Sequence, residues 1–176
     1  MSASSTLAAV AVCLACVACA SPRTGYTLRV TIAPDANDRA PVPVDVVFVW
    51  DKNTAGKVGG LTAADWFASK PQFRHDDPDH KALTICEWEW VPGQAVPEIN
   101  LAIPAAARRW AHGVYVFTKY RTAGTHRSSL APGVTSLLEL GRDDATLRSV
   151  GSRTSDAYAW VDERCPAVQP PDQLPS

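Results

Sequence analysis

The chain has 176 residues, of which 46% are hydrophobic and 20% charged, and its formal net charge is -1 at pH 7. These proportions are close to those of ordinary globular domains, and the length suits one domain around one hydrophobic core. A chain without a basic excess has little with which to neutralise phosphates, so nucleic acid is excluded as its main partner.

The first segment has the composition of an export signal. Residues 7–20 are uncharged and apolar, and they include Cys13, Cys16 and Cys19. An apolar run of this length is too short to cross a bilayer about 30 Å thick, but it is typical of a cleaved signal peptide. The residues before Cys19 favour lipidation there, with Cys16 as the alternative, and an ordinary secretory signal is a second interpretation. We therefore expect a lipoprotein signal peptide over residues 1–18 and a mature protein outside the cytoplasm.

Two cysteines, Cys86 and Cys165, follow the signal segment. In an oxidising compartment two thiols commonly form a disulfide when their Cα atoms come within about 7 Å. We expect this bond to join the end of the domain to a strand in the middle of the chain. Closing so long a loop would remove about 4 kcal/mol of denatured-state entropy in the simplest treatment. Two separate buried thiols are the alternative.

Alternating apolar and polar residues predict the first two strands. Residues 26–32 alternate strictly, and residues 42–50 repeat the pattern with a second face that is also partly apolar. Between them, residues 34–41 are rich in Pro, Asn and Asp, which favour turns, and so predict a surface loop after a short linker at 19–24.

One short helix is predicted at residues 62–68, because Thr62 is a good N-cap and helix-compatible residues follow it. Trp66 and Phe67 would pack this helix against the sheet. Alternation then returns at residues 82–91, with cysteine and tryptophans on one face and glutamates on the other.

The rest of the chain predicts further short strands at 99–103, 113–120, 135–140 and 146–150, with a helical turn or two at 105–111. Many short strands with few helices indicate an all-β fold, an antiparallel β-sandwich with one or two short helices, over residues 25–165. Residues 166–176 are too rich in proline to pair and predict a disordered tail.

Candidate metal ligands occur in one segment, where His75, Asp76, Asp79 and His80 stand close together. Imidazoles and carboxylates are the groups that bind divalent metals, so a metal-dependent hydrolase is one hypothesis. The same Asp-Pro-Asp sequence is typical of an exposed turn, and we favour a solvated loop with no metal.

Other candidates for catalysis are equally weak. Glu87 and Glu89 share one face of a strand, and His112 or His126 could act as a base. The polar face of an amphipathic strand explains the glutamates more simply, and no nucleophile motif accompanies the histidines. The sequence therefore predicts no enzyme and no cofactor.

The order of several segments is similar to that of a known family. A polar loop at 33–41 is followed by a valine-rich strand, an Ala-Asp-Trp-Phe helix at 64–67, a Pro-Gly turn at 92–93, and an Ala-Arg-Arg-Trp-Ala-His-Gly-Val entry to a strand at 107–114. In this order they resemble the TssJ-type lipoproteins of type VI secretion. Trp66 in place of a phenylalanine and the longer last motif indicate a divergent member.

The resemblance implies a transthyretin-like β-sandwich held by an acylated cysteine on the periplasmic face of the outer membrane. Members of that family bind the periplasmic domain of the inner-membrane protein TssM and so tether the envelope complex. Their binding loop corresponds here to Asp35, Ala36, Asn37, Asp38 and Arg39. A generic outer-membrane lipoprotein that binds another protein or a ligand is the alternative.

Overall fold

A computed structural model describes residues 25–102, 111–152 and 159–160. The predicted signal peptide, both candidate lipidated cysteines, the linker, Cys165, the tail and residues 105–110 of the expected helical turn lie outside these described residues. Those expectations stay predictions.

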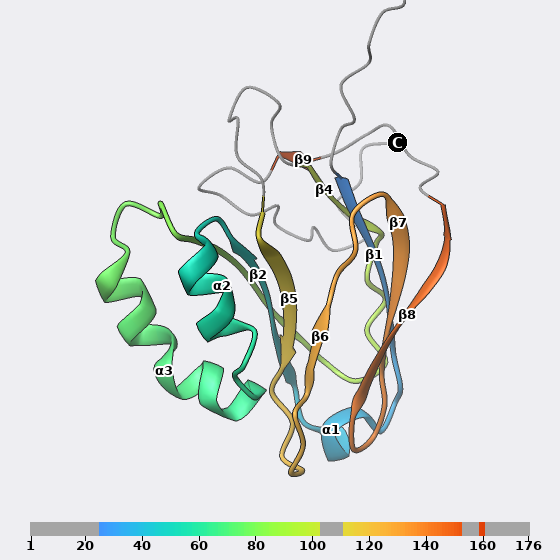
Figure 1. Ribbon diagram of the computed structural model, residues 1–176. Helices are drawn as coiled ribbons and strands as arrows, with labels where there is room; N and C mark the ends of the chain where they lie inside the picture. Colours follow the sequence, from blue (N-terminus) through green and yellow to red (C-terminus); the bar gives the residue numbers. More distant parts are fainter. Residues whose placement is uncertain (1–24, 103–110, 153–158, 161–176) are drawn as a thin grey trace, which may run out of the picture.

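Two β-sheets pack face to face and form a sandwich (Figure 1). The first sheet has the order β8-β7-β1-β4-β9, and its strands are β1 (Gly25–Ile32), β4 (Ile99–Ala102), β7 (Val134–Leu140), β8 (Ala145–Ser152) and β9 (Ala159–Trp160). The second has the order β3-β2-β5-β6, with β2 (Val42–Val49), β3 (Leu83–Trp90), β5 (Gly113–Thr118) and β6 (Arg127–Ser129). The predicted β-sandwich is confirmed.

The pairing is antiparallel except at two places. β1 runs parallel to β7, with Thr27 opposite Thr135 and Ile32 opposite Leu140, and β4 runs parallel to β9. Alternation along a strand predicts which face is buried, but it does not specify the neighbouring strand or its direction. The predicted antiparallel β-sandwich is thus confirmed for most strand pairs; the first sheet is mixed, while the second sheet is antiparallel throughout its described pairs.

The described part of the chain contains three helices, which corrects the expectation of one or two. They are the single turn α1 (Ala36–Arg39), α2 (Lys52–Val58) and α3 (Ala63–Asp76). α3 begins at the predicted cap, where Thr62 and Asp65 form a capping box, but it continues well beyond residue 68. None of the described helices is long and apolar enough to cross a membrane.

A missed cap explains why α2 was not predicted. The side chain of Asp51 accepts a hydrogen bond from the backbone N–H of Thr54 at 2.7 Å and so fixes the first turn. Gly59 and Gly60 follow closely and suggested a break in the chain. The helix is short, and its buried Ala55 and Val58 hold it on the sheet.

Two hydrophobic cores lie on opposite faces of the second sheet. The larger core fills the space between the two sheets and includes Leu28, Phe48 and Leu138. The smaller core lies between the second sheet and helices α2 and α3 (Figure 1). There Trp66 is fully buried and stacks on Phe117 with 5.0 Å between ring centroids, which confirms the predicted packing of α3.

Cys86 lies in the larger core and is disulfide-bonded. Its strand has the predicted faces, because Cys86 and Trp90 are buried whereas Glu87 and Glu89 are exposed. The identity of the second cysteine, which we predict to be Cys165, stays a prediction.

Candidate partner-binding end of the sandwich

Three connections between strands meet at one end of the sandwich, where Figure 1 shows α1 beside the turns that follow β5 and β7. They are residues 33–41 between β1 and β2, residues 119–126 between β5 and β6, and residues 141–144 between β7 and β8. We call this surface the loop end. It contains all five residues that the sequence predicted for partner binding.

The backbone of α1 is left-handed over three successive residues. The φ angles are 48° at Asn37, 54° at Asp38 and 65° at Arg39. A left-handed conformation costs a residue with a side chain about 1–2 kcal/mol, although Asn and Asp tolerate it better than others. Three such residues in sequence therefore need contacts from the rest of the fold to hold them.

Asn37 supplies those contacts. Its side chain is buried, its Nδ2 donates to the Pro41 carbonyl oxygen at 2.9 Å, and its Oδ1 accepts from the backbone N–H of Arg121 at 3.0 Å. Its own backbone N–H donates to the carbonyl oxygen of Gly141. One asparagine thus joins all three connections of the loop end.

Further hydrogen bonds join the other two connections to each other. The hydroxyl of Tyr120 donates to the Gly141 carbonyl oxygen at 3.0 Å, and the hydroxyl of Thr122 donates to the carbonyl oxygen of Asp143. Burial, together with the negative charge of Asp144, raises the pKa of Tyr120 above its ordinary value. The phenol therefore stays protonated and remains a donor at neutral pH.

His126 is a buried structural residue of the loop end. Its Nδ1 lies 2.7 Å from an Asp144 carboxylate oxygen, and its Nε2 lies 2.9 Å from the Thr122 carbonyl oxygen. Its ring stacks on Tyr120 with 5.1 Å between centroids. Both ring nitrogens thus have partners within the loop end.

The five predicted binding residues divide into two groups. Asp35, Asp38 and Arg39 are exposed, whereas Ala36 and Asn37 are buried. The predicted surface loop is confirmed for most of its residues, but Ala36 and Asn37 are buried within it, which leaves three of the five predicted binding residues exposed.

Two residues of the same surface were missed by the sequence analysis. Arg121 and Arg142 are exposed at the loop end, and Arg142 lies 3.4 Å from the Asp38 carboxylate. Both arginines are far from α1 in the sequence: Arg121 is 84 positions after Asn37, and Arg142 is 104 positions after Asp38. No local pattern signals that proximity.

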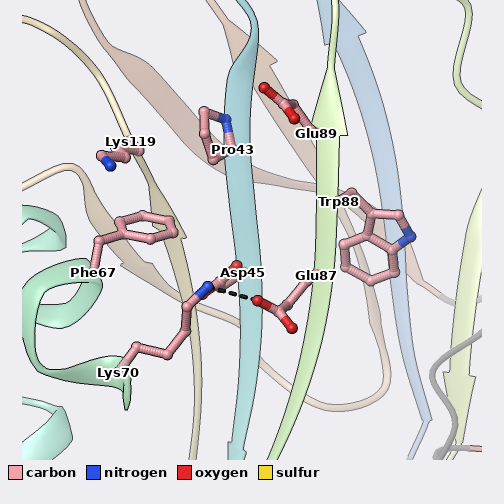
Figure 2. Close-up of a pocket in the computed structure, with 8 residues that line it drawn as sticks. All are labelled: Pro43, Asp45, Phe67, Lys70, Glu87, Trp88, Glu89 and Lys119. Carbon is pink, nitrogen blue, oxygen red and sulfur yellow. Dashed lines mark hydrogen bonds and ion pairs between the residues drawn. The ribbon is translucent and has the colours of Figure 1, made fainter. Parts of the chain in front are cut away.

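A shallow groove of about 440 Å³ lies between α3 and the outer face of β2 and β3 (Figure 2). Its lining residues are Pro43, Asp45, Phe67, Lys70, Glu87, Trp88, Glu89 and Lys119. In Figure 2 the indole of Trp88 points away from the other side chains, toward the opposite side of its strand. Lys70 and Lys119 both lie over the ring of Phe67, 4.9 and 5.6 Å from its centroid.

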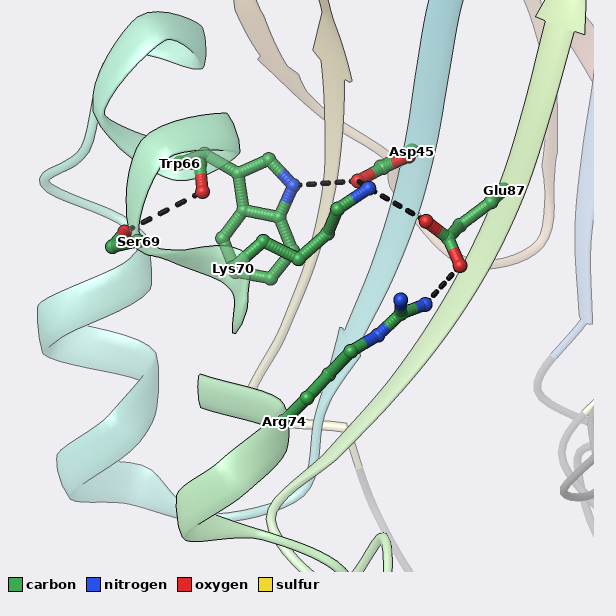
Figure 3. A network of polar contacts seen from close by, with 6 residues as sticks. All are labelled: Asp45, Trp66, Ser69, Lys70, Arg74 and Glu87. Carbon is green, nitrogen blue, oxygen red and sulfur yellow. Dashed lines mark hydrogen bonds and ion pairs between the residues drawn. The ribbon is translucent and has the colours of Figure 1, made fainter. Parts of the chain in front are cut away.

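A polar network fastens α3 to the sheet beside this groove (Figure 3). The Asp45 side chain, only 2% exposed, accepts from Trp66 Nε1 at 2.8 Å and from Lys70 Nζ at 2.9 Å. Lys70 also pairs with Glu87 at 2.6 Å, and Arg74 pairs with the other oxygen of Glu87. Glu87 therefore takes part in holding the helix.

The pKa values of the two carboxylates in this network, Asp45 and Glu87, are shifted in opposite directions. Burial raises the pKa of Asp45 above its ordinary value, although hydrogen bonds from Trp66 and Lys70 act in the opposite direction. Partial burial of Glu87 is outweighed by Lys70 and Arg74, which lower its pKa below the ordinary value. Trp66 and Lys70 thus both stabilise the charged form of Asp45.

The other candidate catalytic groups are dispersed. His75, Asp76, Asp79 and His80 are exposed at the end of α3 and in the turn after it, where Asp79 pairs with Lys81 at 2.7 Å. Within the described ranges, no group of three or more His, Cys, Asp or Glu is arranged to hold a metal ion. His112 is exposed at the opposite end of β5 from His126.

Taken together, the geometry defines a two-sheet β-sandwich with a helical layer, in which loops at one end form the candidate site. Solved structures share this fold. The type VI secretion lipoprotein TssJ1 from Pseudomonas aeruginosa aligns with a TM-score of 0.53 and 16% identity over 75% of this chain and 100% of its own. Lip from Serratia marcescens, a membrane-bound component of the type VI secretion system, aligns with a TM-score of 0.52 and 15% identity over 75% and 99%.

No protein-family model and no curated protein sequence matches the chain. The likeness therefore rests on three-dimensional structure. The predicted resemblance to TssJ-type lipoproteins is confirmed at the level of the fold: the chain has the β-sandwich of these structures along almost their whole length.

Proposed function

We propose that this protein is a non-enzymatic lipoprotein of a type VI secretion envelope complex, anchored in the outer membrane, and that its loop end binds the periplasmic domain of a TssM-type inner-membrane protein. The fold shared with two type VI secretion lipoproteins supports the assignment to this class. No cofactor and no metal take part in this function.

The left-handed turn at residues 37–39 is the observation that carries the binding proposal. Backbone strain persists where the surrounding structure fixes it, and it concentrates at functional sites. Here the buried Asn37 fixes the turn, so that Asp35, Asp38 and Arg39 are presented on a rigid loop. A rigid loop loses little conformational entropy when a partner binds.

The orientation of β1 is consistent with a tether between two membranes. β1 begins at Gly25, at the end of the sandwich opposite to α1, and leads into the loop end (Figure 1). The strand has 8 residues and rises about 3.3 Å per residue, so the loop end lies about 25 Å from its start. Cys19 precedes Gly25 by only six positions. An acyl anchor at Cys19 would therefore keep the loop end directed away from the outer membrane and toward the periplasm.

A pull-down with the TssM-type periplasmic domain of the same genome tests this proposal. The chain from residue 20 to 176 keeps every described residue and both hydrophobic cores. We expect it to capture the partner, and we expect the triple variant Asp35→Ala, Asp38→Asn, Arg39→Asn to lose capture, because asparagine removes the charges and tolerates the positive φ of 54° and 65° at these positions. Asn37 is left in place so that the loop stays folded.

Arg29→Ala with Glu98→Ala is the matched control, because this ion pair lies on the first sheet and both side chains are partly exposed. Its capture is expected to equal that of the wild type. A folded wild-type chain that does not bind would contradict the proposal and favour a generic lipoprotein with another partner.

A further inference from the structure

We propose that the edge of the second sheet formed by β3 binds an extended segment of another protein as an added strand, and that this segment carries a basic side chain opposite Glu89. Among the described strands, β3 is the outermost strand of its sheet and pairs only with β2. No residue of the loop end takes part, so this inference does not depend on the proposed function.

Three residues of β3 direct unpaired backbone groups outward. Trp50, just after β2, donates to the Ala82 carbonyl oxygen, so the even-numbered residues of β3 face β2 in the antiparallel register. The backbone N–H and C=O groups of Ile85, Glu87 and Glu89 therefore point away from β2. Within the described ranges, these backbone groups have no hydrogen-bond partner.

Side chains close this edge at both ends but not in its middle. The Asp77 carboxylate accepts from the backbone N–H of Leu83 at 2.8 Å, and Gln94 Oε1 accepts from the backbone N–H of Val91 at 3.0 Å. These side-chain acceptors satisfy donors that a neighbouring strand would otherwise bind. The open stretch is therefore residues 85–89, which suits an extended segment of about five residues.

The other outermost strands of the described part offer less backbone for pairing. β6 has three residues and β9 has two, and the pairing of β7 with β8 is interrupted by a register shift at Thr135 and Ser136. Short strands and bulges are common ways of protecting a sheet edge. β3, in contrast, has eight residues and pairs with β2 without a register shift.

Charge specifies the kind of strand that fits. Glu87 and Glu89 lie on the groove side of β3, whereas Trp88 points to the other side (Figure 2). Glu87 is already paired with Lys70 and Arg74, but Glu89 is exposed and has no ion-pair partner among the described residues. A lysine or arginine directly opposite Glu89 would form a favourable cross-strand pair.

The same charges disfavour a second copy of this chain as the occupant. When residues 85–89 of two copies pair with each other in antiparallel orientation, the two copies of Glu87 stand directly opposite each other. Like charges in that position are destabilising. A basic segment of a different protein therefore fits this edge better.

Backbone amide NMR of the full chain with a synthetic peptide tests this inference. The probe is an acetylated and amidated peptide of alternating lysine and valine, about five residues long to match the open stretch. We expect saturable binding that slows hydrogen exchange at the amides of Ile85, Glu87 and Glu89. Binding that leaves exchange at these three amides unchanged would overturn the proposal.

Two comparisons separate the charge from the backbone pairing. In Glu89→Lys we expect the lysine peptide to bind about fivefold more weakly and a peptide with glutamate in place of lysine to bind more tightly than it binds wild type. Asp143→Lys is the charge-matched control, since Asp143 is exposed between β7 and β8, and it should bind both peptides as wild type does.

The second comparison uses the lysine peptide with all of its amides N-methylated. This probe keeps the side-chain charges but donates no backbone hydrogen bond, so we expect it not to bind wild type. Equal binding of the methylated and unmethylated peptides would show that the attraction is electrostatic only, and strand addition at β3 would be wrong.

Discussion

Replacing Lys70 with alanine is expected to lower the free energy of unfolding by about 3 kcal/mol, because a buried charge would lose its counterion. The Asp45 side chain is only 2% exposed, and without Lys70 its remaining side-chain partner among the described residues is the indole N–H of Trp66 (Figure 3). Urea denaturation followed by tryptophan fluorescence measures the loss.

Arg74→Ala is the matched control for this prediction. Arg74 and Glu87 are 47% and 39% exposed, so their ion pair is screened by solvent, and its removal should cost less than about 1 kcal/mol. If the two variants lose the same free energy of unfolding, Asp45 does not depend on Lys70 in the way that the structure indicates.

The effect of Lys70→Ala should grow with pH. Burial already raises the pKa of Asp45 in the folded protein, and the contributions of Lys70 lower it. Without Lys70 the folded pKa rises further, so that the folded state binds the proton more tightly than the unfolded state does. The stability of Lys70→Ala relative to wild type is therefore highest below the pKa of Asp45 in the unfolded chain, about 4. It falls as the pH rises through the pKa of Asp45 in the folded variant.

Asn37→Ala is expected to disorder the loop end and to weaken partner binding about tenfold. The variant leaves the Arg121 N–H and the Pro41 carbonyl oxygen without their partners and puts alanine at a φ of 48°. We expect a loss of about 2 kcal/mol in the free energy of unfolding. A tenfold change in affinity corresponds to about 1.4 kcal/mol of binding free energy.

Asn37→Gly is the informative comparison, because glycine tolerates the φ of 48° and loses only the two side-chain hydrogen bonds. Its stability and affinity should lie between those of wild type and Asn37→Ala. Wild-type affinity in Asn37→Ala would show that the partner does not require the left-handed turn.

Most strands could be predicted because one face of each is buried. In β3, for example, Cys86 and Trp90 alternate with Glu87 and Glu89 in the sequence. In the structure, the first two side chains are buried and the two glutamates are exposed, as this alternation predicts. β6 escaped prediction since its three residues, Arg127–Ser129, are polar and partly exposed, and it forms only by pairing with β5.

Helix ends and strand order depend on information that is not local. α3 was predicted from its N-cap residue Thr62, but its length comes from contacts such as Lys70 with Asp45 on β2, 25 residues earlier. In the same way, β1 and β7 become parallel neighbours although they are separated by most of the domain. Propensity within a short window does not specify such pairings.

The assignment of residues 35–39 as a binding site stays a prediction, but the structure shows where these residues lie. The resemblance to TssJ-type proteins pointed to residues 35–39, and the structure places them at one end of the sandwich. Asn37 is a good turn former, and for that reason the sequence suggested an exposed residue. Its burial follows from Arg121 and Gly141, which reach it only in the folded protein.

The most direct test of partner binding at the loop end is a hydrogen-exchange footprint of the complex between the lipidated full-length protein and the TssM-type periplasmic domain. We predict that binding slows exchange in residues 33–41, 119–126 and 141–144 and leaves α3 unchanged. Protection confined to α3 and the groove beside it, or to β8, with no change at the loop end, would contradict binding at the loop end.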